Sequence, residues 1–413
     1  MVLTHGVGSV YESPLPLSLY LVGAAGTVLI SFVLRALVTA DPRASGQRTI
    51  MGPATADVLI ALGRAVALIG LLLTVIFAVV DPERGFSVAP LLFWVGLVIS
   101  TALLEAICAG IWTQTNAWTT LKDLLRLPDR ERQLPWWLGP LLVYVLFWFE
   151  LVSGRGFDPL VIMVVLLAYT LFVFAVGDDR EEVDPLSILF GFAGRCAPLQ
   201  LTDAGVVYKG PLSDLAEERP MPRGLMGAVF LLLAATTLDN MRETVEWNSL
   251  LNNLGLDSAP HVVVDSIALL LFTLPFLLPF LAAVWIAGRW LNGDSLSARL
   301  AWSLIPIGVA YLIGHNLPLL ITGLPQLAVQ IGEQFGLQLF GNYIPSPKLV
   351  WFLEIAVIVG GHVLGVLSSH RIAARLADSH GAALKSHTTL TVLMCAFTVA
   401  TLWLLSLPLV VQA

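Results

Sequence analysis

Ten apolar runs, each close to the length that crosses a lipid bilayer, dominate this sequence. A transmembrane helix needs about 20 consecutive, mostly apolar residues to cross the hydrocarbon core. The runs occupy residues 15–38, 58–80, 88–112, 136–152, 159–176, 224–241, 262–290, 300–322, 349–368 and 389–410. In lipid only helices and closed barrels satisfy all of their backbone polar groups. The sequence therefore predicts an all-α, polytopic transmembrane helical bundle of about ten spans.

Charged residues are too few for a soluble surface. They make up 12% of the 413 residues, against roughly 25% in soluble domains, whereas hydrophobic residues make up 57%. We therefore predict a single integral membrane domain over residues 1–413, with the lipid bilayer as its main partner. The net charge of −7 and the scattered basic residues argue against nucleic-acid binding. Three widely spaced cysteines are too few for a disulfide framework.

The lysines and arginines predict the orientation of the bundle. With the N-terminus outside, the outer loops hold only four of the 22 basic residues, Arg84, Arg155, Arg242 and Lys348. Arg64 lies within the second span, and all the others fall in inner loops, as the positive-inside rule requires. We therefore place both termini outside and the protein in a plasma (inner) membrane. No cleavable signal peptide precedes the first span, so we expect that span to persist.

Proline positions predict where helices begin and break. In or just after the eighth span, three prolines predict a kinked or broken helix; they are Pro306, Pro318 and Pro325. Asp158 and Asp184 each precede a proline, and this pair of residues is typical of a helix N-terminus.

The loop over residues 178–223 is the only sizeable piece outside the spans, and we assign it to the cytoplasmic side. Its apolar stretch 186–199 is too short to span, so we interpret it as an interfacial or re-entrant segment. Residues 199–209 alternate in polarity around a turn and predict a small hairpin.

Ionisable residues gather in the outer third of the predicted bundle. Such residues are rare within spans and mark functional sites by default. At 1.5 Å of rise per residue, the predicted depths bring together Glu150, Asp239, Arg242, Glu243, Glu246, Asp265, His315, Asn316 and Glu354, with His5, Glu12 and His261 in the outer tail and loop. Asp239 and Arg242 also have the spacing of a simple ion pair on one helix.

Imidazole and carboxylate groups together suit zinc, copper, iron or manganese. We therefore take Glu150, Asp239, His315, His362 and His5 as candidate metal ligands. Glu150 and Asp239 are also the candidate catalytic residues.

His362 is the candidate cofactor-binding residue. It follows Gly360-Gly361, where another helix or a flat cofactor can approach closely. A haem bridging His315 and His362 is the less favoured cofactor, because their predicted depths differ by about 10 Å. We interpret His370 as an interfacial histidine at the inner end. For Arg64 and Glu105 we leave open a role in a pathway or a structural pairing.

Short motifs along almost the whole chain resemble those of a known family. They include His5-Gly6-Val7-Gly8, Phe93-Trp94-Val95-Gly96, Trp148-Phe149-Glu150-Leu151, Arg195-Cys196-Ala197-Pro198-Leu199, Thr237-Leu238-Asp239, Gly314-His315 and Gly361-His362-Val363. On these motifs the chain resembles the fenitrothion hydrolase-like membrane proteins of bacteria and archaea. The resemblance implies a polytopic bundle that hydrolyses an organophosphate triester, most simply with metal-activated water. It favours Glu150, Asp239, His315 and His362 as site residues.

Three functions are open at this point. The first is a metal-assisted hydrolase with its site in the outer half of the bundle. The second is a non-catalytic subunit of a respiratory or redox complex that holds haem or copper and has other membrane subunits as partners. The third is an ion or substrate transporter whose path is lined by carboxylates, namely Glu105, Glu150, Asp239, Asp265 and Glu354.

Overall fold

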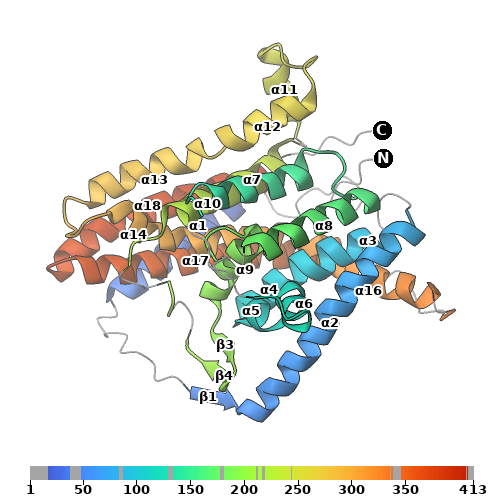
Figure 1. Ribbon diagram of the computed structural model, residues 1–413. Coiled ribbons are helices and arrows are strands. Elements are labelled where there is room, and N and C mark those ends of the chain that lie inside the picture. The colour runs from blue at the N-terminus through green and yellow to red at the C-terminus, as the bar shows by residue number, and fades with distance from the viewer. Residues whose placement is uncertain are drawn as a thin grey trace.

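The computed structural model describes residues 17–37, 48–82, 87–128, 134–176, 181–210, 213–215, 219–242, 244–334, 336–337, 346–405 and 407. Over these residues the protein is an all-α bundle suited to a lipid bilayer, as predicted (Figure 1). Within the described ranges, eight helical segments are long and apolar enough to cross a membrane: Pro53–Val80, Val88–Ile107, Pro159–Val176, Arg223–Arg242, His261–Ala287, Leu296–His315, Lys348–Leu376 and His380–Leu404. Shorter apolar helices occupy the other two expected positions. The number of spans and their orientation stay predictions.

The helices follow one another along the chain with few long connections. In order they are α1 (Leu17–Leu37), α2 (Pro53–Val80), α3 (Val88–Pro90), the π-helix η1 (Leu91–Ile99), α4 (Ser100–Ile107), α5 (Ile111–Thr115), α6 (Ala117–Leu124), α7 (Leu138–Leu151), α8 (Pro159–Val176), α9 (Pro185–Cys196), α10 (Arg223–Arg242), α11 (Val245–Asn253), α12 (His261–Leu271), α13 (Leu274–Ala287), α14 (Leu296–Leu300), the 3₁₀-helix η2 (Ala301–Leu304), α15 (Ile305–His315), α16 (Leu317–Gln334), α17 (Pro347–Leu376) and α18 (His380–Leu405).

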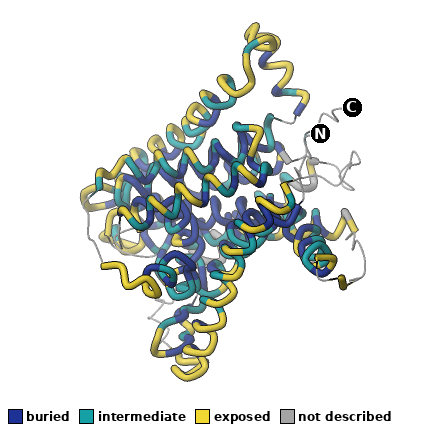
Figure 2. The backbone as a smooth tube through the Cα atoms, turned by 45° about the vertical axis from the view of Figure 1, so that its right-hand side comes forward, coloured by how far each residue is buried: buried dark blue, intermediate teal, exposed yellow. Residues whose placement is uncertain are grey.

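Two helices form the centre of the bundle. Of the residues in an 18-residue apolar stretch of α10, 72% are buried. In the corresponding stretch of Leu296–His315, which contains α15, 78% are buried. In α2 only 11% of the corresponding residues are buried, although the mean hydropathy of this helix is among the highest of the eight membrane-length segments. Figure 2 shows the buried residues in the middle of the bundle and the exposed ones on its outer helices. An apolar helix with an exposed face is what a lipid environment allows.

Glycines bring α17 directly against α15. A Cβ atom on Gly361 would lie 2.2 Å from Cβ of Ala310 and 2.6 Å from the Pro306 carbonyl oxygen. A Cβ on Gly365 would lie 2.9 Å from the carbonyl oxygen of Ser303. The close approach predicted at Gly360-Gly361 is therefore made at Gly361, and its partner there is a helix.

The eighth span is broken, as the prolines predict. α15 ends at His315, Asn316 has φ −87° and ψ 1°, and α16 begins at Leu317. α16 then packs against η1, where a Cβ on Gly323 would lie 2.8 Å from Cγ2 of Val95. The break therefore places the side chain of Asn316 between two helices that have different neighbours.

A four-stranded sheet lies at one end of α2 (Figure 1). Its order is β1 (Arg48–Met51), β4 (Gly205–Tyr208), β3 (Leu199–Thr202) and β2 (Cys108–Ala109). β3 and β4 form the predicted hairpin, with Thr202 opposite Gly205. β1 pairs with β4 in antiparallel fashion and β2 with β3 in parallel. β1, β3 and β4 come from loops that the charge rule places on the inner side, and β2 comes from the last residues of the predicted third span.

The short apolar stretch before the hairpin is a helix inside the bundle. α9 packs against α4, α7 and α15, and most of its residues are buried. It begins as predicted, since the Asp184 carboxylate accepts a hydrogen bond from the Leu186 amide at 3.1 Å and Pro185 starts the helix. The same buried carboxylate also accepts hydrogen bonds from Tyr169 Oη at 2.8 Å and Ser187 Oγ at 2.7 Å. This network fixes α9 to α8.

Candidate functional site

A chain of charged groups joins three helices at the end of the bundle that the charge rule places outside. Nε2 of His315, at the end of α15, lies 2.6 Å from Oδ2 of Asp239 on α10. Nη2 of Arg242, one turn further along α10, lies 3.1 Å from Oδ1 of Asp239. The Arg242 guanidinium also donates a hydrogen bond to the carbonyl oxygen of Leu151, at the end of α7. Asp239 therefore carries two contacts at once, an ion pair and a contact with imidazole.

A second polar contact holds the same two central helices in register. The Asn240 side-chain amide on α10 donates to Oη of Tyr311 on α15 at 2.6 Å and to the Thr236 carbonyl at 3.1 Å. The Tyr311 ring in turn lies beside the His315 ring, with centroids 6.4 Å apart. Because Asp239 is itself buried, this surrounding packing restricts the positions that the carboxylate and the imidazole can take.

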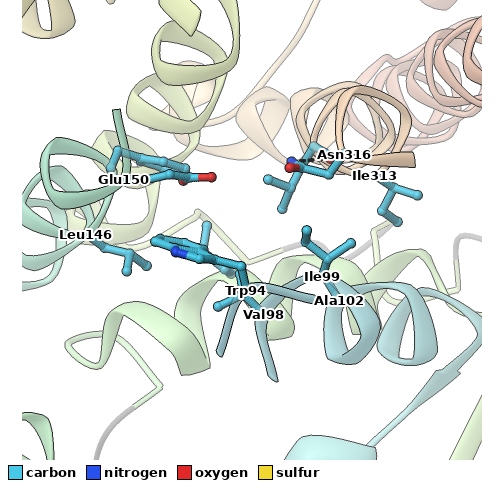
Figure 3. Close-up of a pocket in the computed structure, with 11 residues that line it drawn as sticks. Trp94, Val98, Ile99, Ala102, Leu146, Glu150, Ile313 and Asn316 are labelled. Atoms are coloured by element: carbon cyan, nitrogen blue, oxygen red, sulfur yellow. Dashed lines mark hydrogen bonds between the residues drawn. The ribbon is translucent and has the colours of Figure 1, made fainter. Parts of the chain in front are cut away.

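A small buried cavity lies beside this chain of charges (Figure 3). Its volume is about 10 Å³, close to the roughly 10–15 Å³ that one water molecule needs. Nine of its eleven lining residues are apolar, and the two polar ones are Glu150 and Asn316. Figure 3 shows the Glu150 carboxylate pointing across the cavity towards Asn316, with Trp94 on the wall below. Asn316 donates to the Leu312 carbonyl at 3.0 Å, which fixes its side chain.

The Glu150 carboxylate has no hydrogen-bond partner within the part of the chain that the structure describes. The charged groups that act on it are Asp239, His315 and Arg242. Glu354 of α17 also lies within electrostatic reach of His315. The structure thus brings together the two candidate catalytic residues and one of the candidate metal-binding histidines.

His362, the other candidate histidine that the structure describes, is not part of this cluster. His362 is fully buried in the middle of α17 and donates from Nδ1 to the carbonyl oxygen of Ile358, one turn earlier, at 2.9 Å. Its Nε2 atom is buried and has no hydrogen-bond partner among the described residues. His5 falls outside the described residues, as do Glu12 and Glu243.

Among the described residues, the Asp239 carboxylate of this cluster is paired with the His315 imidazole and with Arg242. Both carboxylate oxygens of Asp239 already have partners, and one of these partners is Nε2 of His315. Over the described ranges no three His, Cys, Asp or Glu side chains lie close enough to hold an ion together. The binding of zinc, copper, iron or manganese at this site stays a prediction, as does the binding of haem. Elemental analysis of protein purified without added metal tests the metal prediction.

Two ionisable residues whose roles the sequence analysis left open, Glu105 and Arg64, make structural contacts. The Glu105 carboxylate accepts hydrogen bonds from the Gly110 amide at 3.1 Å and from the Trp112 amide. Nε of Arg64 donates to the Gln114 carbonyl at 2.9 Å. Both contacts secure the turn that follows α4, so a structural pairing accounts for each residue.

Two histidines pair at the end of the bundle that the charge rule places inside, and the sequence analysis did not predict this pairing. The rings of His370 on α17 and His387 on α18 have centroids 4.6 Å apart, and both side chains are buried. His370 therefore packs inside the protein against a second helix, and its depth at the membrane interface stays a prediction. His387 was missed because it lies in the polar first turns of α18, before the apolar run that marks the span.

No family model, no curated protein and no solved structure matches the chain. The resemblance to fenitrothion hydrolase-like proteins accordingly rests on the sequence motifs alone and stays a prediction.

Proposed function

We propose that this protein is a multi-pass membrane hydrolase that activates a water molecule at Glu150, in the outward-facing half of a bundle in the plasma membrane. One observation carries the proposal. A carboxylate that has no hydrogen-bond partner among the described residues faces a buried cavity the size of one water, directly beside the Asp239–His315–Arg242 chain.

Glu150 has the role of general base in this proposal. A carboxylate removes a proton from water when the two are within hydrogen-bond reach, and a water in so small a cavity is within that reach. The apolar walls exclude further water, and this strengthens electrostatic interactions inside the site. His315 and Arg242 are held beside Glu150 by Asp239, so their positive ends are preorganised to stabilise negative charge as it develops on a substrate.

The lining of the cavity favours a neutral, lipid-soluble ester as substrate. Nine apolar residues surround the two polar ones, so an apolar body with a single reactive polar group matches the site. A phosphate triester is such a molecule, and the motif resemblance supports this choice. Because the cavity holds about one water, the substrate enters only when the surrounding side chains move.

Release of 4-nitrophenolate from diethyl 4-nitrophenyl phosphate by the purified protein in liposomes tests the proposal. We expect saturable release above that of empty liposomes, measured at 400 nm or so, with and without added zinc or manganese. Release no faster than from empty liposomes under every metal condition would overturn the hydrolase proposal.

Coupled ion transport is a second candidate, favoured by the break between α15 and α16. Transporters often place their binding sites where a helix is interrupted, and Asn316 interrupts the span directly after His315. Liposomes that enclose a pH-sensitive dye distinguish the two functions. Proton uptake that is driven by a potassium diffusion potential and is lost in Asp239→Asn would favour transport. Uptake equal to that of empty liposomes would exclude transport as a candidate function.

A further inference from the structure

Trp94 occupies the wall of the cavity below Glu150 and is 2% exposed. Its indole Nε1 donates to the Gly156 carbonyl oxygen, in the loop between α7 and α8, at 2.7 Å. Its ring stacks on that of Phe149, with centroids 5.9 Å apart and planes 24° apart. The ring of Phe93 meets it edge-on at 4.8 Å. Trp94 is therefore held from three sides in one orientation.

The backbone that carries Trp94 is also fixed. Residues 91–99 form a π-helix, a rare conformation that often occurs at functional sites. Ser100 stabilises its end, because its hydroxyl and its amide both donate to the Val95 carbonyl oxygen. On the opposite side Gly323 of α16 lies against Val95. The indole consequently cannot withdraw from the cavity by a shift of its own helix alone.

We infer that Trp94 determines the size of the substrate that reaches Glu150. This inference rests on the proposed hydrolase function and identifies Trp94 as a specificity-determining residue of the same site. Indole is the largest side chain on the cavity wall, so its volume limits the space beside the carboxylate. Trp94→Ala would enlarge this mostly apolar cavity by the volume of an indole ring, and enlarged apolar cavities bind aromatic guests of matching size.

Two measurements on Trp94→Ala and Trp94→Phe test the inference. Indole should raise the melting temperature of Trp94→Ala in detergent but not that of the wild type. The ratio of kcat/KM for dibutyl over dimethyl 4-nitrophenyl phosphate should rise at least ~10-fold in Trp94→Ala, since each methylene accommodated is worth ~10-fold or more. Trp94→Phe should show a smaller rise in the same direction.

The lipid-facing Trp285→Ala is the matched control, because Trp285 is 69% exposed on α13. It should leave both measurements unchanged. An unchanged substrate ratio in a folded Trp94→Ala, or indole stabilisation of the wild type equal to that of the variant, would overturn the inference. If the wild type hydrolyses neither ester, the proposed function fails; indole binding still decides separately whether Trp94 fills the cavity.

Discussion

Replacing Asp239 with alanine is expected to destabilise the protein by about 3–5 kcal/mol, because it leaves two partly buried cationic groups without the carboxylate that they contact directly. Asp239 is 6% exposed and is the partner of both Arg242, at 3.1 Å, and His315, at 2.6 Å. Its loss leaves the guanidinium with only the Leu151 carbonyl among the contacts described above. Thermal unfolding in mild detergent measures the effect as a lowered melting temperature and reduced yield of folded protein.

Asp257→Ala is the matched control for this prediction. Asp257 is an exposed carboxylate in the loop between α11 and α12, and its removal should change the stability by no more than about 0.5 kcal/mol. Equal melting temperatures for the Asp239 and Asp257 variants would show that the charged chain does not hold α10 and α15 together.

Gly361→Ala is expected to cost about 1–3 kcal/mol or more, because a new methyl group would overlap atoms of a packed neighbouring helix. The added Cβ would lie 2.2 Å from Cβ of Ala310 and 2.6 Å from the Pro306 carbonyl oxygen. Neither atom belongs to a flexible side chain, so the two helices themselves must separate. The variant should unfold at a lower temperature than the wild type in the same detergent.

Its neighbour Gly360 provides an unusually close comparison. A Cβ on Gly360 meets no atom within 4 Å. Gly360→Ala should therefore be neutral or stabilise α17 by up to about 1 kcal/mol through helix propensity. If the two alanine variants unfold at the same temperature, the contact between α15 and α17 is not made at Gly361.

The helices and their breaks could be predicted from the sequence because local features determine them. The length of each apolar run predicts a helix, and Asp184-Pro185 predicts the start of α9. Pro306, Pro318 and Pro325 predict a kinked or broken helix, and the structure has this break at Asn316. The alternation around the turn at residues 203–204 likewise placed the β3–β4 hairpin. Depth along each helix was sufficient to bring Glu150, Asp239 and His315 to the same end of the bundle.

The contacts within the site could not be predicted in the same way, because they depend on how each helix is rotated about its axis. Asp239 and His315 are in contact only because the face of α10 that carries Asp239 is turned towards the face of α15 that carries His315. The sequence of neither helix alone specifies this rotation. The same holds for the pairing of His370 with His387. The π-helix that presents Trp94 has no sequence signal that we recognise, since residues 91–99 look like any apolar stretch.

The most direct test of the proposed site compares the hydrolysis rates of Glu150→Gln and Glu333→Gln with that of the wild type. Glutamine keeps the shape of Glu150 but cannot accept the proton from water, so kcat for 4-nitrophenyl phosphotriester hydrolysis should fall by ~10²–10⁴-fold. Glu333 is an exposed carboxylate near the end of α16, and its replacement should leave the rate unchanged. A Glu150→Gln protein that folds and hydrolyses the ester at the wild-type rate would contradict the assignment of Glu150 as the base.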